Sequence, residues 1–165
     1  LLLLVIGWYL IGIPIGSIAS DIALDIEKNI VSGILSLAAA KLWPNAKIIA
    51  VDIDEEAVLV TASNAQNNKL DSQVSVGQSN GYQSDIVQQN KTYDLILANI
   101  LARPLLEMAQ DLNDALDKNG YCILSGFVEE QEDWIISSPR QQNLQLENLY
   151  KLDNWRAALM KKVQR

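Results

Sequence analysis

The chain has 165 residues, 49% of them hydrophobic, which is enough for one globular domain with a buried core. Its net charge of -7 argues against a protein that holds nucleic acid through phosphate contacts, because such proteins need clusters of Lys and Arg. The sequence contains no histidine, which excludes Ser-His-Asp catalysis, histidine-ligated zinc and imidazole acid–base chemistry.

The first 20 residues, LLLLVIGWYLIGIPIGSIAS, carry no charge. A membrane span needs about 20 apolar residues, but Gly7, Gly12, Pro14 and Gly16 interrupt this run, and the basic start of a signal peptide is missing. We interpret residues 1–20 as an apolar lead-in, either a buried helix or strand or a truncated start. The lack of an initiating Met favours truncation, and a true span or signal is the alternative.

Strand and helix patterns alternate through the rest of the chain. The predicted strands are Ile22–Ile26, Lys47–Asp52, Val74–Val76, Tyr93–Ala98, Tyr121–Ser125, Leu144–Tyr150 and Trp155–Lys161. The predicted helices are Gly33–Leu42, Asp54–Asn67, Pro104–Leu116 and Glu129–Ser137, with a loop at Ser79-Asn80-Gly81 and a turn at Lys118-Asn119-Gly120. Strands separated by helices imply right-handed crossovers, so an α/β fold with a parallel sheet is expected.

Acidic residues stand at the ends of the first two of these strands. Strand one ends at Asp25-Ile26 and strand two at Asp52, a spacing close to that of Rossmann-like nucleoside sites. The Asp52 carboxylate can accept two hydrogen bonds from ribose hydroxyls, and Ile53 can pack on an adenine face. The alternative for Asp52 is a solvated strand-end carboxylate, whereas Asp54 is better explained as a helix N-cap.

The turn after strand one reads EKNIVSG and holds one glycine, Gly33. A dinucleotide site needs several glycines there, so that the backbone can approach the ligand. Without a GxGxxG pattern, a Rossmann dehydrogenase is not expected.

Residues 93–104, YDLILANILARP, form an apolar strand pattern that runs into the amide of Asn99. Ligands of open parallel sheets sit just beyond the carboxyl ends of the strands. Asn99 is therefore a candidate to touch a substrate, and the alternative is a turn residue that caps the next helix. The single cysteine, Cys122, lies in the apolar run YCIL and is expected to be a buried core residue. This cysteine usage fits a reducing, cytoplasmic location.

From Ile22 onward the chain resembles the bacterial ribosomal protein L-eleven methyltransferase family, whose members are class I S-adenosylmethionine-dependent methyltransferases. The matching stretches are LDI, SGILSLAAAKL, IIAVDIDEEAV, SNGYQS, YDLILANILARPLLEMA, LSGFVEEQ and WRAALMKK. The resemblance implies a Rossmann-like methyltransferase sandwich, with a mostly parallel seven-stranded sheet and an antiparallel last strand. Residues 21–165 would then be the catalytic domain. It would transfer methyl groups to amino groups of a basic ribosomal protein, without binding nucleic acid or membrane.

The same resemblance implies a set of site residues. Asp52 would bind the cofactor ribose, and Asn80-Gly81 would sit at the adenine edge, where the family commonly has Asp instead of Asn80. Asn99 would lie beside the methyl donor and the incoming amine as the catalytic residue. The full set expected to contact S-adenosylmethionine is Asp25, Gly33, Asp52, Ile53, Asn80, Gly81 and Asn99, and no metal is expected.

The chain also departs from the family pattern. The family's loop after strand one is GCGSG-like, whereas EKNIV here replaces its first three residues and adds two. The Thr- and His-bearing segment before strand one and the separate substrate-recognition domain are not found. Two alternatives follow: a catalytically impaired, methyltransferase-like binding module, or a methyltransferase of the same fold that acts on another protein or a small molecule.

Overall fold

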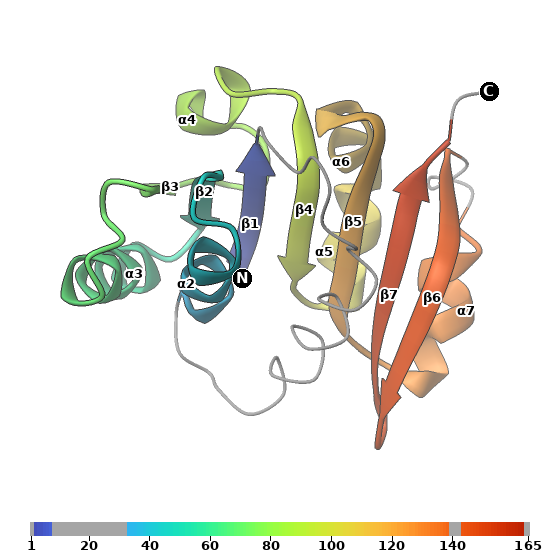
Figure 1. Ribbon diagram of the computed structural model, residues 1–165. Coiled ribbons are helices and arrows are strands. Elements are labelled where there is room, and N and C mark those ends of the chain that lie inside the picture. Colours follow the sequence, from blue (N-terminus) through green and yellow to red (C-terminus); the bar gives the residue numbers. More distant parts are fainter. Residues whose placement is uncertain (1, 8–32, 139–142, 164–165) are drawn as a thin grey trace.

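The computed structural model describes residues 2–7, 33–138 and 143–163 (Figure 1). The strands within these residues are β1 (Leu2–Gly7), β2 (Lys47–Asp52), β3 (Val74–Gln78), β4 (Tyr93–Asn99), β5 (Leu116–Val128), β6 (Leu144–Leu152) and β7 (Trp155–Lys162). The helices are α2 (Ile34–Leu42), α3 (Glu55–Asn67), α4 (Asp85–Gln88), α5 (Ala102–Glu107), α6 (Ala109–Ala115), α7 (Glu132–Ile136) and the 3₁₀ turn η1 (Glu129–Gln131).

The strands form a seven-stranded sheet in the order β3-β2-β1-β4-β5-β7-β6. The pairs β2–β3 and β4–β5 are parallel, whereas β7 is antiparallel to both β5 and β6. All described strands except β1 and β7 run in one direction. This confirms the predicted α/β fold with a mostly parallel sheet and an antiparallel last strand.

The centre of the sheet differs from the expectation. The position between β2 and β4 is filled by β1, which is antiparallel to both neighbours. The predicted strand Ile22–Ile26 lies outside the described residues, as does the predicted boundary between residues 20 and 21. Of the alternatives for the apolar lead-in, the strand is the one seen over Leu2–Gly7. In the part of the chain that the structure describes, no helix has the length and apolarity to cross a membrane.

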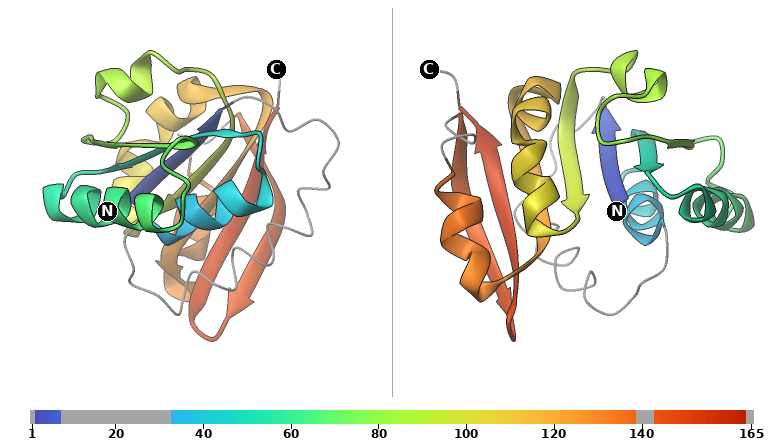
Figure 2. Two further views of the ribbon diagram at one scale, coloured as in Figure 1. Left: turned by 60° about the vertical axis from the view of Figure 1, so that its left-hand side comes forward. Right: turned by 180° about the vertical axis from the view of Figure 1, so that it is seen from behind.

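Helices cover both faces of the sheet, in three layers (Figures 1 and 2). Because strand side chains alternate between faces, β2 supplies Ile48 and Ala50 to the core beneath α2, and Ile49 and Val51 to the core beneath α5 and α6. The buried pattern KIIAVD is therefore a strand covered on both sides, as the sequence predicts.

Several elements differ from their predicted bounds. The predicted helix Glu129–Ser137 is the 3₁₀ turn η1 followed by α7, and α4 lies in a stretch without a predicted helix. The predicted helix Pro104–Leu116 is two helices, α5 and α6, which meet at Met108. The predicted turn at residues 118–120 lies inside β5, where Asn119 takes a left-handed φ of 63° and the register with β4 shifts. The turn-forming residues thus make a bulge in the strand, because the chain stays paired with β4 on either side of them.

Candidate active site

The sheet register aligns polar residues in one row at the carboxyl ends of the strands. Asp52 pairs with Gln78 on one side, and Asn99 pairs with Ser125. The backbone of Leu2 lies between Asp52 and Asn99 and pairs with both. We call Gln78, Asp52, Asn99 and Ser125 the polar row.

The side chains of the polar row share one face of the sheet. Side chains two residues apart on a strand lie on the same face. Asp52 therefore shares a face with Ile48 and Ala50, and Asn99 shares it with Leu95 and Leu97, which all belong to the core beneath α2. The row therefore lies at the end of the sheet face that α2 and α3 cover.

Asp52 is fixed at the end of β2. Its side chain is 5% exposed, and the backbone N–H of Asp54 donates to Asp52 Oδ1 at 3.0 Å. The carbonyl of Asp52 accepts a hydrogen bond from Ser79 N at 2.9 Å, which ties the loop after β3 to the same point. The neighbouring Ile53 is 48% exposed, so an apolar side chain stands open to solvent beside a held carboxylate.

The loop at residues 79–81 is held by its own hydrogen bonds. Ser79 Oγ donates to the Gly81 carbonyl at 2.8 Å and accepts from Ser84 N at 3.2 Å. Gly81 has a φ of 59°, and a Cβ there would collide with Met108 Sδ. Glycine is favoured at this position because the backbone is left-handed and a side chain would displace Met108, while the Asn80 side chain remains exposed.

Gly33 begins α2 as its N-cap, with a φ of 85°. A Cβ there would collide with the side chain of Thr61 on α3. Ser36 Oγ donates to the Gly33 carbonyl at 2.6 Å. The glycine is thus explained by the close approach of α2 to α3. Asp25 and the residues 27–31 lie outside the described residues, and their expected contact with a cofactor stays a prediction.

Asn99 ends β4 and is half-buried. Ser125 Oγ donates to Asn99 Oδ1 at 3.2 Å, which orients the amide. The N-cap of the following helix α5 is Leu101. The alternative interpretation of Asn99 as a helix cap is therefore wrong.

Ser125 and Gly126 are site residues that the sequence pattern does not predict. The Ser125 carbonyl accepts from Ile100 N at 3.1 Å, and a Cβ on Gly126, whose φ is 89°, would overlap the Ile100 carbonyl. Gly126 lets β5 approach the segment that follows Asn99. The available signal was the Ser-Gly pair directly after the buried run YCIL.

Groups of acidic or cysteine side chains close enough to hold a metal ion are not found among the described residues. The buried Cys122 is a free thiol, and desolvation raises its pKa well above the usual range, as expected for a core residue. The chemistry available in the polar row is therefore hydrogen bonding by one carboxylate, amides and a hydroxyl.

A family model described as "Ribosomal protein L11 methyltransferase (PrmA)" matches residues 24–163. The chain belongs to the ribosomal protein L11 methyltransferase family. A curated family member from Brucella suis is 35% identical over 139 residues, covering 84% of this chain and 48% of the relative. The chain thus spans about half the length of the curated relatives it matches.

A solved structure agrees with this membership in the L11 methyltransferase family. A ribosomal protein L11 methylase from Lactobacillus delbrueckii subsp. bulgaricus superposes with a TM-score of 0.70 and 25% identity, covering 87% of this chain and 77% of that one. An RNA methyltransferase from Salinibacter ruber, solved with S-adenosyl-L-homocysteine, has a TM-score of 0.54 and 12% identity over 71% of this chain and 66% of that one. The second likeness shows the fold alone.

Proposed function

We propose that the chain is the catalytic part of an S-adenosylmethionine-dependent methyltransferase. Its acceptor is an amino group, a lysine side chain or an α-amine, of a basic ribosomal protein in the cytoplasm, and residues 21–165 form the catalytic domain. The observation that supports this most is the polar row, because the register brings Asp52 and Asn99 to one end of one sheet face. Family membership supports the class of reaction.

The donor set fits the cofactor. Asp52 offers carboxylate oxygens to the ribose diol, the exposed Ile53 offers an apolar surface to adenine, and Asn80 has an exposed amide for the adenine edge. When bound, S-adenosylmethionine supplies the activated methyl group. We expect Gly33 and Gly81 to border it, and Asp25 to contact it from the segment before α2.

Asn99 is the residue we assign to the acceptor amine. An in-line displacement needs the amine neutral, with its lone pair aimed at the methyl carbon. The Asn99 amide oxygen has two acceptor sites. Ser125 Oγ donates to one of them at 3.2 Å, and the other can accept a hydrogen bond from the amine N–H. This chemistry needs no imidazole base, in agreement with a chain that lacks histidine.

One observation favours a second candidate, an impaired binding module of the same fold. Because β1 is antiparallel, its amino end at Leu2 lies in the polar row, while its carboxyl end at Gly7 pairs with Lys47 at the opposite edge. A glycine loop that follows a parallel central strand would instead emerge beside Asp52. The EKNIV sequence in place of glycines points the same way.

Two measurements test the proposal. Calorimetry with S-adenosylmethionine should give a saturable binding heat, and radiolabelled cofactor should transfer methyl groups to purified ribosomal protein L11. Asn99→Ala should keep cofactor affinity within about threefold and lower kcat by about 100-fold, because misplacement of the amine costs rate and not cofactor binding.

The matched control is Asn45→Ala, which removes an exposed amide between α2 and β2. This substitution should change neither the affinity for S-adenosylmethionine nor kcat. If the chain binds S-adenosylmethionine but transfers no methyl group, the impaired binding module is the better description of its function. If calorimetry detects no binding heat at millimolar S-adenosylmethionine, the cofactor assignment is overturned. Turnover that survives Asn99→Ala would remove the role of Asn99.

A further inference from the structure

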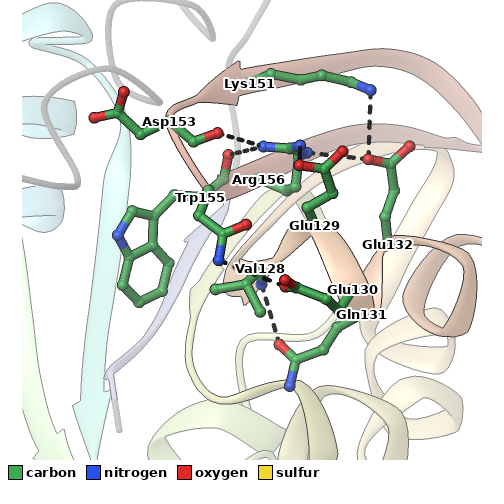
Figure 3. Close-up of polar contacts among 10 residues, drawn as sticks. Val128, Glu129, Glu130, Gln131, Glu132, Lys151, Asp153, Trp155 and Arg156 are labelled. Atoms are coloured by element: carbon green, nitrogen blue, oxygen red, sulfur yellow. Dashed lines mark hydrogen bonds and ion pairs between the residues drawn. The ribbon is translucent and has the colours of Figure 1, made fainter.

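Arg156 is a buried cation that joins two segments at the carboxyl end of the sheet. Its side chain is 3% exposed. Nη2 lies 2.7 Å from Glu129 Oε2 and Nε donates to Glu132 Oε2 at 3.0 Å, while Nη1 donates to the carbonyls of Asp153 and Trp155 at 2.9 Å each (Figure 3). One guanidinium thus ties the β6–β7 turn to the segment that follows β5.

Further hydrogen bonds and an ion pair support the same junction. Glu129 N donates to the Asn154 carbonyl at 2.9 Å, and Lys151 Nζ lies 3.5 Å from Glu132 Oε2. Gln131 Oε1 accepts from Val128 N at 3.1 Å and closes the turn η1. The donors of Arg156 are directed at protein acceptors, so its role is to hold these segments together.

The residue beside Arg156 faces the other side of the sheet. On β7, Ala157 pairs with Ser125 of the polar row, and Trp155 lies two residues away, on the same face as Ala157. Arg156 points to the opposite face, toward the carboxylates of η1 and α7. In Figure 3 the Trp155 indole points away from those carboxylates, and it is 48% exposed.

The register also gives the distance of Trp155 from the polar row. The strand β7 lies two positions from β4 in the sheet, and Trp155 stands two residues beyond the row, which places its Cα roughly 12 Å from that of Asn99. The β6–β7 turn projects past the end of β4 (Figure 1). An indole and a lysine side chain together span this distance.

We propose that Arg156 is a positioning residue that holds Trp155 beside the acceptor end of the polar row, where the indole contacts the incoming lysine-bearing segment. The proposal rests on the proposed function. Asp52 and Asn80 take the β2–β3 side of Asn99 for the cofactor, which leaves the β5–β7 side for the acceptor. The indole face attracts the ammonium group of a lysine-bearing chain through a cation–π contact.

The test separates substrate binding from cofactor binding. With ribosomal protein L11 as substrate, Trp155→Ala should raise KM about tenfold and leave the Kd for S-adenosylmethionine unchanged, while Trp155→Phe should restore most of the loss. The matched control is Trp134→Ala, which removes an equally exposed indole (52%) on α7, and its KM should stay at the wild-type value.

The role of Arg156 is tested by a double-mutant cycle. Arg156→Met should raise KM to a similar extent, and Trp155→Ala combined with Arg156→Met should raise it no further, because the arginine acts through the indole. If Arg156→Met does not fold, Glu132→Gln weakens the same contact and should raise KM in the same direction.

Three outcomes overturn the inference. The first is an unchanged KM in Trp155→Ala. The second is a double variant whose KM rises by the product of the two single effects. The third is an Arg156→Met variant that loses thermal stability while its KM stays at the wild-type value. In each case wild-type transfer stands, so the proposed function survives. A wild-type chain that transfers no methyl group defeats the proposed function itself and is recognised before any variant is compared.

Discussion

Ser125 and Asn99 show how a single hydroxyl can set the direction of an amide. The two residues are 26 positions apart in sequence, and only the β4–β5 register brings them together. Ser125 is buried, so its hydroxyl has little water to compete for it, and the 3.2 Å hydrogen bond to Asn99 Oδ1 holds the amide in one orientation.

Replacing this serine should therefore affect catalysis more than binding. We expect Ser125→Ala to lower kcat about tenfold while the Kd for S-adenosylmethionine stays within twofold, because the loss of one neutral hydrogen bond frees the amide to rotate. Steady-state kinetics and calorimetry give the two values. Ser75→Ala, an exposed serine on β3, is the control. Equal kcat in both variants would contradict the orienting role.

At the scale of single residues, the sequence predicts those that end their strands. Asp52 closes an apolar run and Asn99 closes another, and both lie in the polar row. Ser125, Gly126 and Arg156 could not be assigned their contacts in advance, because their partners are set by strand register and by the approach of separate segments.

Helix α3 is an element whose start can be explained locally. Asp54 is its N-cap, and its side chain accepts a hydrogen bond from Glu56 N at 2.9 Å, as predicted. Glu55 and Glu56 in the first turn add favourable charge at the positive end of the helix dipole. The cap also follows Asp52 directly, so the helix start and the candidate ribose contact belong to one tight turn.

Removing the cap should destabilise the protein without disabling the site. Asp54→Ala should lower the free energy of unfolding by about 1 kcal/mol, since a backbone N–H of the first turn loses its acceptor. Asp54→Ser should retain most of this stability because serine also caps. Urea denaturation of both variants and wild type provides the comparison, and equal losses in Ala and Ser would show that the side-chain cap is not the cause.

Other elements could not be delimited from local sequence. The break between α5 and α6 falls at Met108, where neither Gly nor Pro signals an end, and Met108 Sδ packs where a Cβ of Gly81 would lie. The predicted turn at residues 118–120 is wrong, because pairing with β4 keeps these residues inside β5 although Asn119 has a left-handed φ. Tertiary contacts decided both boundaries.

The whole molecule has two cores separated by the sheet, and the fully buried phenol and thiol groups of the described residues lie in one of them. Tyr82, Tyr93 and Cys122 are all buried in the core beneath α5 and α6. Desolvation raises the pKa of Tyr82 well above its usual value and that of Tyr93 to about 12, and it also raises the pKa of the Cys122 thiol. This core tolerates these groups only in their neutral forms.

Alkaline pH should therefore unfold the protein. The unfolded chain releases the Cys122 proton from about pH 9 and the phenol protons from about pH 10, whereas the folded chain retains them, so stability falls as pH rises from about 9 toward 12. Urea midpoints measured from pH 7 to pH 11.5 should decline above about pH 9 and more steeply above about pH 10. In Tyr93→Phe the decline should be smaller, although the hydrogen bond to Val87 O is lost at every pH. A pH-independent midpoint would refute this.

The alternation of strand and helix patterns predicts the parallel sheet and its layers, because each crossover is local in sequence. The direction of β1 could not be predicted in this way. Its partners β2 and β4 lie far along the chain, and an apolar run can pair in either orientation with equal local preference.

The central strand β1 also joins the two halves of the sheet. Among the described strands, β1 provides the only backbone pairing between β2–β3 and the block formed by β4, β5, β7 and β6. Without residues 2–7, the inner edges of β2 and β4 would present unpaired N–H and C=O groups, the kind of surface to which a strand from another molecule adds. In the absence of β1, a strand from another molecule can therefore pair with β2 and β4 in its place.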